Sequence, residues 1–137
     1  MKSVGIIAEY NPFHNGHAYQ LQKAKEASGA DFAVAVMSGD FVQRGEPAMF
    51  EKRLRARWAL ENGADMVITL PAPFALASAE AFALGGVTLL SRSGIADSIA
   101  FGSECGDTDL LCRAADVLSD EPDELKALIR SNISRGL

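Results

Sequence analysis

Both histidines of the chain lie in one four-residue stretch, His14-Asn15-Gly16-His17. An apolar run that is typical of a strand precedes this stretch, and a predicted helix begins within it. The start of a helix offers unpaired backbone N–H groups and a partial positive charge, which attract phosphate. His14 and His17 are three residues apart, so both imidazoles can face one side of the first turn and donate to phosphate oxygens. The stretch therefore predicts a phosphate site.

The neighbours of the two histidines support this interpretation. Gly16 has no side chain, so a phosphate or nucleobase can approach the backbone closely. Asn15 can donate a further hydrogen bond, and Asn11, which precedes Pro12, can hold the loop. Metal binding needs a third ligand, and Glu9 is the only obvious one nearby. We favour phosphate chemistry over a metal site and over a purely structural role, and we expect no metal ligands.

Strands and helices alternate along the chain, which is typical of an α/β fold. We expect strands over residues 3–9, 31–37, 65–70 and 97–101, and helices over residues 16–27, 47–63, 74–90, 107–118 and 122–135. Right-handed crossovers then give a Rossmann-like, doubly wound parallel sheet of about four strands with helices on both faces. If the strand order is 3-2-1-4, residues 9–17 and 102–104 lie across one crevice at the point where the order reverses.

The helix patterns also predict buried positions. On the first helix, which is expected to end at Gly29, the inward residues are expected to be Leu21 and Ala24. On the second helix, which is expected to start at Pro47, they are expected to be Phe50, Leu54 and Trp58. The third helix is expected to be interrupted at Gly85-Gly86.

Composition limits the class of protein. The chain has 137 residues, a net charge of −5 and 48% hydrophobic residues, which suits a single globular domain over residues 1–137. The negative charge argues against a general nucleic-acid binder. No apolar run is long enough for a membrane helix, no leader pattern is present, and we expect a cytoplasmic protein.

The spacing of Cys105 and Cys112 suits neither zinc nor a redox pair, so reduced, packed thiols are expected.

Four segments carry a wider pattern: Gly5–His17, Met37–Ala48, Leu70-Pro71 and Phe101–Glu104. A strand followed by Asn-Pro-Phe-His-Asn-Gly-His and a helix resembles the HxGH signature of the nucleotidyltransferase superfamily, which has a fold of the nucleotidyltransferase/HUP type. Together, the four segments resemble the bacterial tRNA(Met) cytidine acetate ligase family. The resemblance runs through the whole chain, which looks like the amino-terminal portion of such a ligase.

The resemblance implies an enzyme that activates acetate with ATP. Acetyl-adenylate and pyrophosphate form, and the acetyl group then passes to the exocyclic amine of the wobble cytidine of elongator tRNA(Met). His14 and His17 would be the catalytic residues, because they steady the α-phosphate. By position, the ATP site would comprise Ile7, Ala8, Glu9, Tyr10, Asn11, Pro12, Phe13, His14, Asn15, Gly16, His17, Gln20 and Gly102. Mg²⁺ would accompany ATP because of its charge. The implied partners are ATP, acetate and tRNA, without a membrane.

Residues 38–47 form a second candidate segment. Ten residues are many for a simple connection in such a fold, so we expect polar loop residues to meet the acyl group, pyrophosphate or the tRNA end. These candidates are Ser38, Gly39, Asp40, Gln43 and Arg44. The alternative is a solvated loop.

The basic run that follows is Lys52, Arg53, Arg55 and Arg57. It is interpreted as a solvated helix face with Glu51–Arg55 and Arg57–Glu61 pairs, in preference to a tRNA phosphate contact.

The superfamily's second signature is absent from its usual place. That signature is a Ser/Thr-rich turn whose basic residue neutralises the β- and γ-phosphates. Ser91–Gly94 precedes the fourth predicted strand, and Asn132–Arg135 lies in a terminal helix. Two alternatives therefore stay open: a nucleotidyltransferase that acts on a small phosphorylated metabolite, and a catalytically silent nucleotide-binding fragment.

Overall fold

The computed structural model describes residues 1–120 and 122–134. The chain forms two compact units, Met1–Phe101 and Gly102–Leu137. The expectation of a single domain over residues 1–137 stays a prediction.

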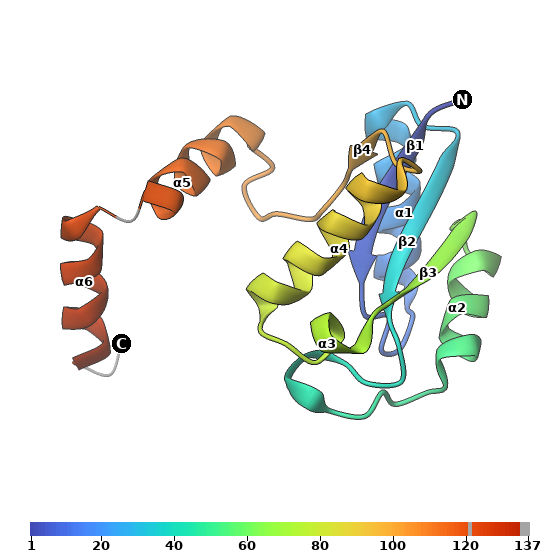
Figure 1. Ribbon diagram of the computed structural model, residues 1–137. Coiled ribbons are helices and arrows are strands. Elements are labelled where there is room, and N and C mark those ends of the chain that lie inside the picture. Colours follow the sequence, from blue (N-terminus) through green and yellow to red (C-terminus); the bar gives the residue numbers. More distant parts are fainter. Residues whose placement is uncertain (121, 135–137) are drawn as a thin grey trace. The chain divides into compact units, whose positions relative to one another are not determined.

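The first unit is built on a parallel sheet with the strand order β3-β2-β1-β4 (Figure 1). Its strands are β1 (Ser3–Ala8), β2 (Phe32–Ser38), β3 (Met66–Leu70) and β4 (Ser98–Ile99). This arrangement confirms the predicted Rossmann-like α/β fold and its strand order. The fourth strand is shorter than predicted, because only Ser98 and Ile99 pair with β1.

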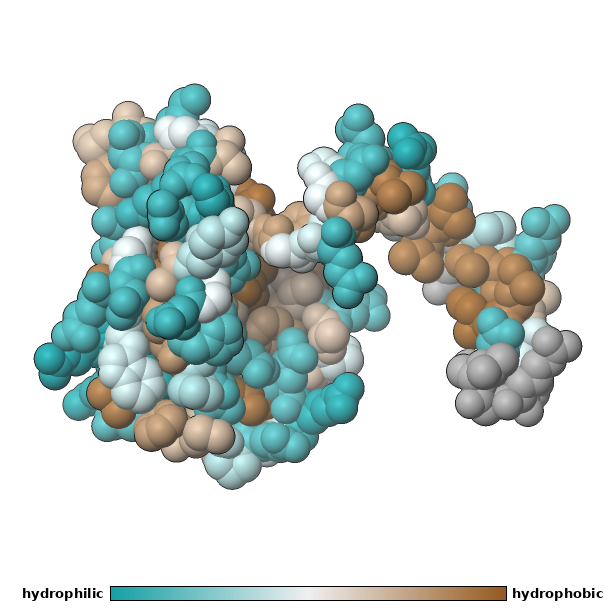
Figure 2. Space-filling model, turned by 180° about the vertical axis from the view of Figure 1, so that it is seen from behind, coloured by the Kyte–Doolittle hydropathy of each residue, from teal (hydrophilic) through white to brown (hydrophobic). Residues whose placement is uncertain are grey.

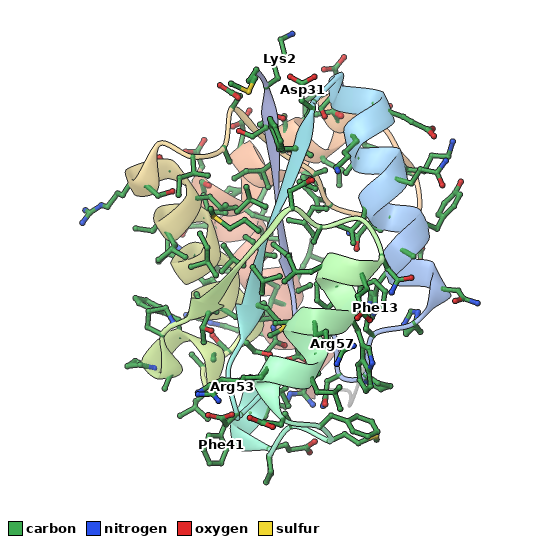
Figure 3. All side chains as sticks on the ribbon, turned by 90° about the vertical axis from the view of Figure 1, so that its right-hand side faces the viewer. Lys2, Phe13, Asp31, Phe41, Arg53 and Arg57 are labelled. Carbon is green, nitrogen blue, oxygen red and sulfur yellow. The ribbon has the colours of Figure 1, made fainter. Side chains whose placement is uncertain are left out.

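Helices cover both faces of this sheet (Figure 3). One face carries α1 (Asn15–Ser28) and α2 (Lys52–Glu61), and the other carries α3 (Ala72–Ala75) and α4 (Ala79–Ser93). Successive side chains of a strand point to opposite faces, so Ala35 and Met37 pack with Leu21 of α1, whereas Val36 packs with Phe82 of α4. Because both faces are covered, the central strands are continuous apolar runs.

Helix α1 agrees with its prediction. It begins at Asn15 and ends at Ser28, and Leu21 and Ala24 are its buried residues. Gly29 follows in the left-handed conformation with φ 63°, which a glycine adopts without steric cost.

The prediction of one helix over residues 74–90, interrupted at Gly85-Gly86, is wrong. The interruption lies earlier, between α3 and α4, and the hydroxyl of Ser78 caps the start of α4. Both glycines lie inside the unbroken helix α4 and are buried. A Cβ on Gly86 would lie 2.7 Å from Ile7 of β1, so a glycine is needed here for α4 to pack closely on the sheet.

The predicted start and buried face of the second helix are also wrong. Pro47 forms a β-bridge with Phe41, which keeps this segment extended, and α2 begins only at Lys52. The buried residues of α2 are Arg55 and Ala59, whereas Phe50 and Leu54 are 39% and 37% exposed.

The second unit contains α5 (Thr108–Asp120) and α6 (Asp123–Ser134), close to the predicted helices over 107–118 and 122–135. Arg135 lies outside the described residues. Brown, hydrophobic side chains reach the surface of this unit (Figure 2), including Leu110, Val117, Leu118, Leu128 and Ile129.

Cys105 and Cys112 are free thiols and both are exposed, so the prediction of packed cysteines is wrong. The reason is that α5, which carries Cys112, buries none of its residues, and Cys105 lies in the exposed segment before it. Within residues 1–120 and 122–134, every helix is too short or too polar to cross a membrane.

Candidate functional site

A polar cavity opens beyond the carboxyl end of β1. Its volume is about 420 Å³ and its walls are Ile7, Ala8, Glu9, Tyr10, Asn11, Pro12, His14, His17 and Gln20. This volume lies within the range of roughly 300–1,000 Å³ that is typical of ligand sites. All nine lining residues belong to the set that the sequence predicts for the ATP site. Phe13, Asn15 and Gly16 adjoin the cavity in sequence, and Gly102 lies in the second unit, so its role stays a prediction.

The two histidine rings stack on each other at the start of α1. Their centroids are 3.7 Å apart and their planes meet at 24°. Nδ1 of His14 accepts a hydrogen bond of 3.1 Å from the N–H of Gly16, and Nδ1 of His17 accepts one of 3.3 Å from the N–H of His14. Because each Nδ1 is an acceptor, the proton of each neutral ring is assigned to Nε2. Both rings therefore keep an Nε2–H donor for a ligand.

Gly16 is required for this arrangement. A Cβ at this position would lie 2.9 Å from Cε1 of His14 and 3.1 Å from its Nδ1, which is closer than carbon atoms pack. Any side chain would push the His14 ring away from the helix start. The glycine between the histidines thus leaves room for the His14 ring, in addition to the access that it gives to a ligand.

Two aromatic rings support His17. The ring centroids of Tyr10 and Phe13 lie 4.9 Å and 5.5 Å from that of His17. Burial lowers the pKa of His17 from its ordinary value, and the neighbouring His14 lowers it further. His17 is therefore a neutral hydrogen-bond donor near pH 7.

Tyr10 is itself almost fully buried and occupies the left-handed region with φ 49°, where residues with side chains are uncommon. Burial raises the pKa of its hydroxyl to about 12. This hydroxyl has no hydrogen-bond partner among the described residues. Tyr10 thus contributes a packed ring to the site and remains protonated at neutral pH.

The loop after β2 is ordered and connected to the cavity. The N–H of Val42 donates to the carbonyl of Glu46, and the N–H of Ala48 donates to the carbonyl of Asp40, both at 2.9 Å. The N–H of Gln43 donates to the Glu9 carboxylate at 2.9 Å. This loop is therefore not a freely solvated connection.

The five predicted loop residues divide into two groups. Ser38 is buried with its hydroxyl 3.5 Å from the Glu9 carbonyl. The N–H of Gln43 donates to the Glu9 carboxylate, and the carbonyl of Gly39 shares the Arg55 guanidinium with the carbonyl of Glu9. The other two point elsewhere: Asp40 pairs with Lys52 at 2.7 Å, and Arg44 is exposed on a turn with φ 66°.

Arg55 is the residue that the sequence interpretation missed. The sequence predicts it on a solvated face, paired with Glu51, yet its side chain is fully buried. Its guanidinium donates to the carbonyls of Glu9 at 2.6 Å, of Phe50 at 2.9 Å and of Gly39. The only signal in the sequence is weak: Arg55 and the small Ala59 are four residues apart and share one helix face.

The other predicted pair on α2 is confirmed. Arg57 and Glu61 form an exposed ion pair of 2.7 Å. The Phe50 and Trp58 rings, expected in the core, instead contact each other edge to face with centroids 5.2 Å apart.

The described residues do not contain a group of three or more His, Cys, Asp and Glu side chains that is suited to a metal ion. Glu9 and the two histidines line the same cavity, but each histidine Nδ1 already accepts a backbone N–H. The arrangement suits an anionic ligand, with two imidazole donors and a helix start converging on one cavity.

Known proteins resemble the whole chain. The HIGH Nucleotidyl Transferase family matches residues 1–137. The tRNA(Met) cytidine acetate ligases of Acetivibrio thermocellus and Caldicellulosiruptor bescii are 53% and 49% identical over 137 and 136 residues, which cover 100% and 99% of this chain but 33% and 34% of theirs. A crystal structure of Thermotoga maritima TmcAL bound with alpha-thio ATP matches with a TM-score of 0.87 and 44% identity, over 100% of this chain and 33% of that chain.

The chain thus spans about a third of the length of these relatives. The resemblance to tRNA(Met) cytidine acetate ligases that the sequence motifs indicate is confirmed by this similarity. The match over residues 1–137 shows that the chain belongs to the HIGH nucleotidyl transferase family.

Proposed function

We propose that this chain binds ATP and forms the nucleotide-binding part of a ligase that acetylates the wobble cytidine of elongator tRNA(Met). The observation that carries the proposal is the pair of stacked imidazoles at a helix start, in which each Nδ1 accepts a backbone N–H and the ring proton is therefore assigned to Nε2. The similarity to ligases with that name, and to a relative crystallised with alpha-thio ATP, supports it.

The proposed first step is the adenylation of acetate. A carboxylate oxygen of acetate attacks the α-phosphorus, and the bond from this phosphorus to the oxygen that bridges to the β-phosphate breaks. Pyrophosphate leaves with the electron pair. Negative charge grows on the α-phosphate oxygens during this displacement, so the Nε2–H groups of His14 and His17 and the start of α1 stabilise it.

The proposed second step is acetyl transfer. The exocyclic amine of cytidine attacks the acetyl carbonyl, AMP leaves with its oxygen, and the amine loses one proton. The loop over residues 38–47 is the candidate contact for the acyl group, pyrophosphate or tRNA end, because Gln43 bonds to Glu9 in the cavity wall. The relatives are bacterial enzymes, and bacterial tRNA is in the cytoplasm, so the proposal includes that location.

ATP is expected to enter as its magnesium complex. Mg²⁺ commonly binds one or two carboxylates together with substrate phosphates and water. Glu9 is a wall residue of the cavity, and one oxygen of its carboxylate accepts the N–H of Gln43, so its second oxygen is the candidate ligand for a metal that the phosphates bring with them. The ion would neutralise phosphate charge, and Glu9 would orient it.

The test is exchange of labelled pyrophosphate into ATP. We expect exchange that requires both acetate and this protein, with ATP binding followed separately by calorimetry. Exchange that requires a phosphorylated metabolite instead of acetate would indicate an adenylyltransferase of that class. ATP binding without any exchange would leave a silent nucleotide-binding module, and the absence of ATP binding would overturn the proposal completely.

A further inference from the structure

A buried positive charge lies behind the wall of the candidate nucleotide cavity. The Arg55 side chain is 0% exposed. Among the described residues, no carboxylate lies within ion-pair distance of its guanidinium. Burial lowers the pKa of Arg55, while the nearby charges of Asp40 and Glu9 raise it. A buried charge is costly unless hydrogen bonds replace its hydration, so the partners of Arg55 must matter to this part of the fold.

Those partners come from three separate segments. They are the carbonyls of Glu9, where the chain has left β1, of Gly39, just after β2, and of Phe50, just before α2. Glu9 is also part of the cavity wall. A guanidinium is planar and its N–H groups have fixed directions, so it holds several acceptors at defined angles, which the single ammonium of a lysine does not.

The chain beyond Glu9 needs such support. Tyr10 follows directly in the left-handed region, with φ 49°, and residues with side chains seldom adopt this conformation unless their surroundings impose it. Its ring packs against His17. The direction in which the chain leaves Glu9 therefore decides where the histidine rings lie.

We propose that Arg55 is a positioning residue for the nucleotide cavity. Through Glu9 it orients the segment that leads to His14 and His17, and through Gly39 it sets the position of the loop after β2. This inference rests on the proposed ATP-binding function. The alternative is a residue that only stabilises the fold and leaves the geometry of the cavity unchanged.

The first test compares Arg55→Lys with Arg57→Lys. Arg57 lies two residues away on α2, is exposed and pairs with Glu61, so Arg57→Lys makes the same chemical change outside the cavity. We expect Arg55→Lys to weaken ATP binding by about tenfold or more, because small displacements of ligand-positioning groups have large effects. Arg57→Lys should remain within about twofold of the unaltered protein.

A second readout separates positioning from stability alone. The chain has two histidines, both in the site, so their ring signals can be followed by NMR without overlap from others. We expect Arg55→Lys to move the pKa of His17 back toward 6.5, the ordinary value. A folded Arg55→Lys protein with unchanged ATP affinity and an unchanged His17 titration would overturn the inference.

A measurement on the unaltered protein covers the case in which Arg55→Lys does not fold. The Nε–H signal of Arg55 should shift when ATP is added, and that of Arg57 should not. If the histidine signals respond to ATP and the Arg55 signal stays unchanged at saturation, the inference is wrong while the proposed function stands. If neither the histidines nor Arg55 respond to saturating ATP, the proposed function fails and the inference fails with it.

Discussion

The loops that leave the neighbouring strands β1 and β2 are built in different ways. The first is held by contacts between residues close in sequence. Tyr10 and Phe13 pack on His17, and the Nδ1 atoms of His14 and His17 accept the backbone N–H groups of Gly16 and His14 at the start of α1. The second is anchored by Arg55, which is 16 residues from Gly39 and also donates to the carbonyl of Glu9, 46 residues away at the start of the first loop. Local contacts shape the first loop beyond Glu9 at low entropic cost, whereas the second loop is positioned by a partner distant in the sequence.

This difference separates the residues that contact the ligand from the residue that positions them. Substitutions in the first loop should alter ligand binding and reactivity while most of the fold persists. Substitution of Arg55 should change both loops together, because it contacts both. The following experiments test that division, beginning with the largest expected effect.

Loss of an imidazole should have the largest effect on reactivity. We expect His14→Asn and His17→Ala each to lower acetate-dependent pyrophosphate exchange by about a hundredfold, which is typical of removing one donor to a developing oxyanion. Asparagine is a good N-cap, so His14→Asn removes the Nε2–H donor but retains an acceptor for the N–H of Gly16. His14→Ala is the matched variant that loses both. If His14→Asn kept more than about a third of the exchange rate, the assigned role of His14 would be wrong.

Gly16→Ala should reduce ATP affinity by about tenfold, because its Cβ would displace the His14 ring from the helix start. Two effects on stability oppose each other here. Helix propensity alone predicts that alanine stabilises α1 by up to about 1 kcal/mol, whereas the 2.9 Å contact with Cε1 of His14 predicts destabilisation. Denaturant unfolding measures the sign, and a more stable Gly16→Ala protein with normal ATP binding would disprove the close-contact argument.

The pH dependence of stability should show the environment of His17. Its native pKa lies below the ordinary value of 6.5 because of burial and the adjacent His14. Between these two values the unfolded chain binds more protons than the native protein, so the free energy of unfolding rises with pH through this window. The stabilising contribution is complete above 6.5 and is lost as the pH falls through the native pKa.

Unfolding experiments at a series of pH values measure this slope, and His17→Asn should reduce it. An NMR titration that placed the pKa of His17 above 6.5 would reverse the sign of the prediction.

The smallest effect is expected for the exposed ion pair of the second loop. Lys52 and Asp40 are 2.7 Å apart, but their side chains are 42% and 55% exposed. Lys52→Met should therefore lower the free energy of unfolding only slightly, and less in high salt. Because Arg55 remains, ATP affinity should change by less than about twofold. A large loss of affinity would show that the loop depends on its surface pair, contrary to the comparison above.

The parts of the fold that follow from local patterns could be predicted. The apolar runs around Val34 and Val67 form strands, and Gly29 ends α1 as its sequence indicates. The face of α2 could not be predicted from its apolar spacing. The spacing of Phe50, Leu54 and Trp58 predicts that these residues are buried. Arg55 is buried instead, because its guanidinium donates to three backbone carbonyls.

A similar limit applies to α4. In the sequence, Gly85-Gly86 indicates a break, because glycine is a poor helix former. In the fold, these glycines allow Phe74 and Ile7 to pack against an unbroken helix. The gain from close packing exceeds the low helix propensity, and this gain exists only once the sheet is assembled.

The candidate site likewise has features that follow from the sequence and features that do not. The sequence by itself determined where phosphate chemistry belongs, because two histidines, a glycine and a helix start lie within a few residues of one another. Only the tertiary structure decided that both Nδ1 atoms accept backbone N–H groups, so that Nε2 carries the proton, and that Arg55 supports the cavity from behind. These features depend on distances between segments far apart in the chain or on the exact turn of the backbone, which residue types and spacing do not encode.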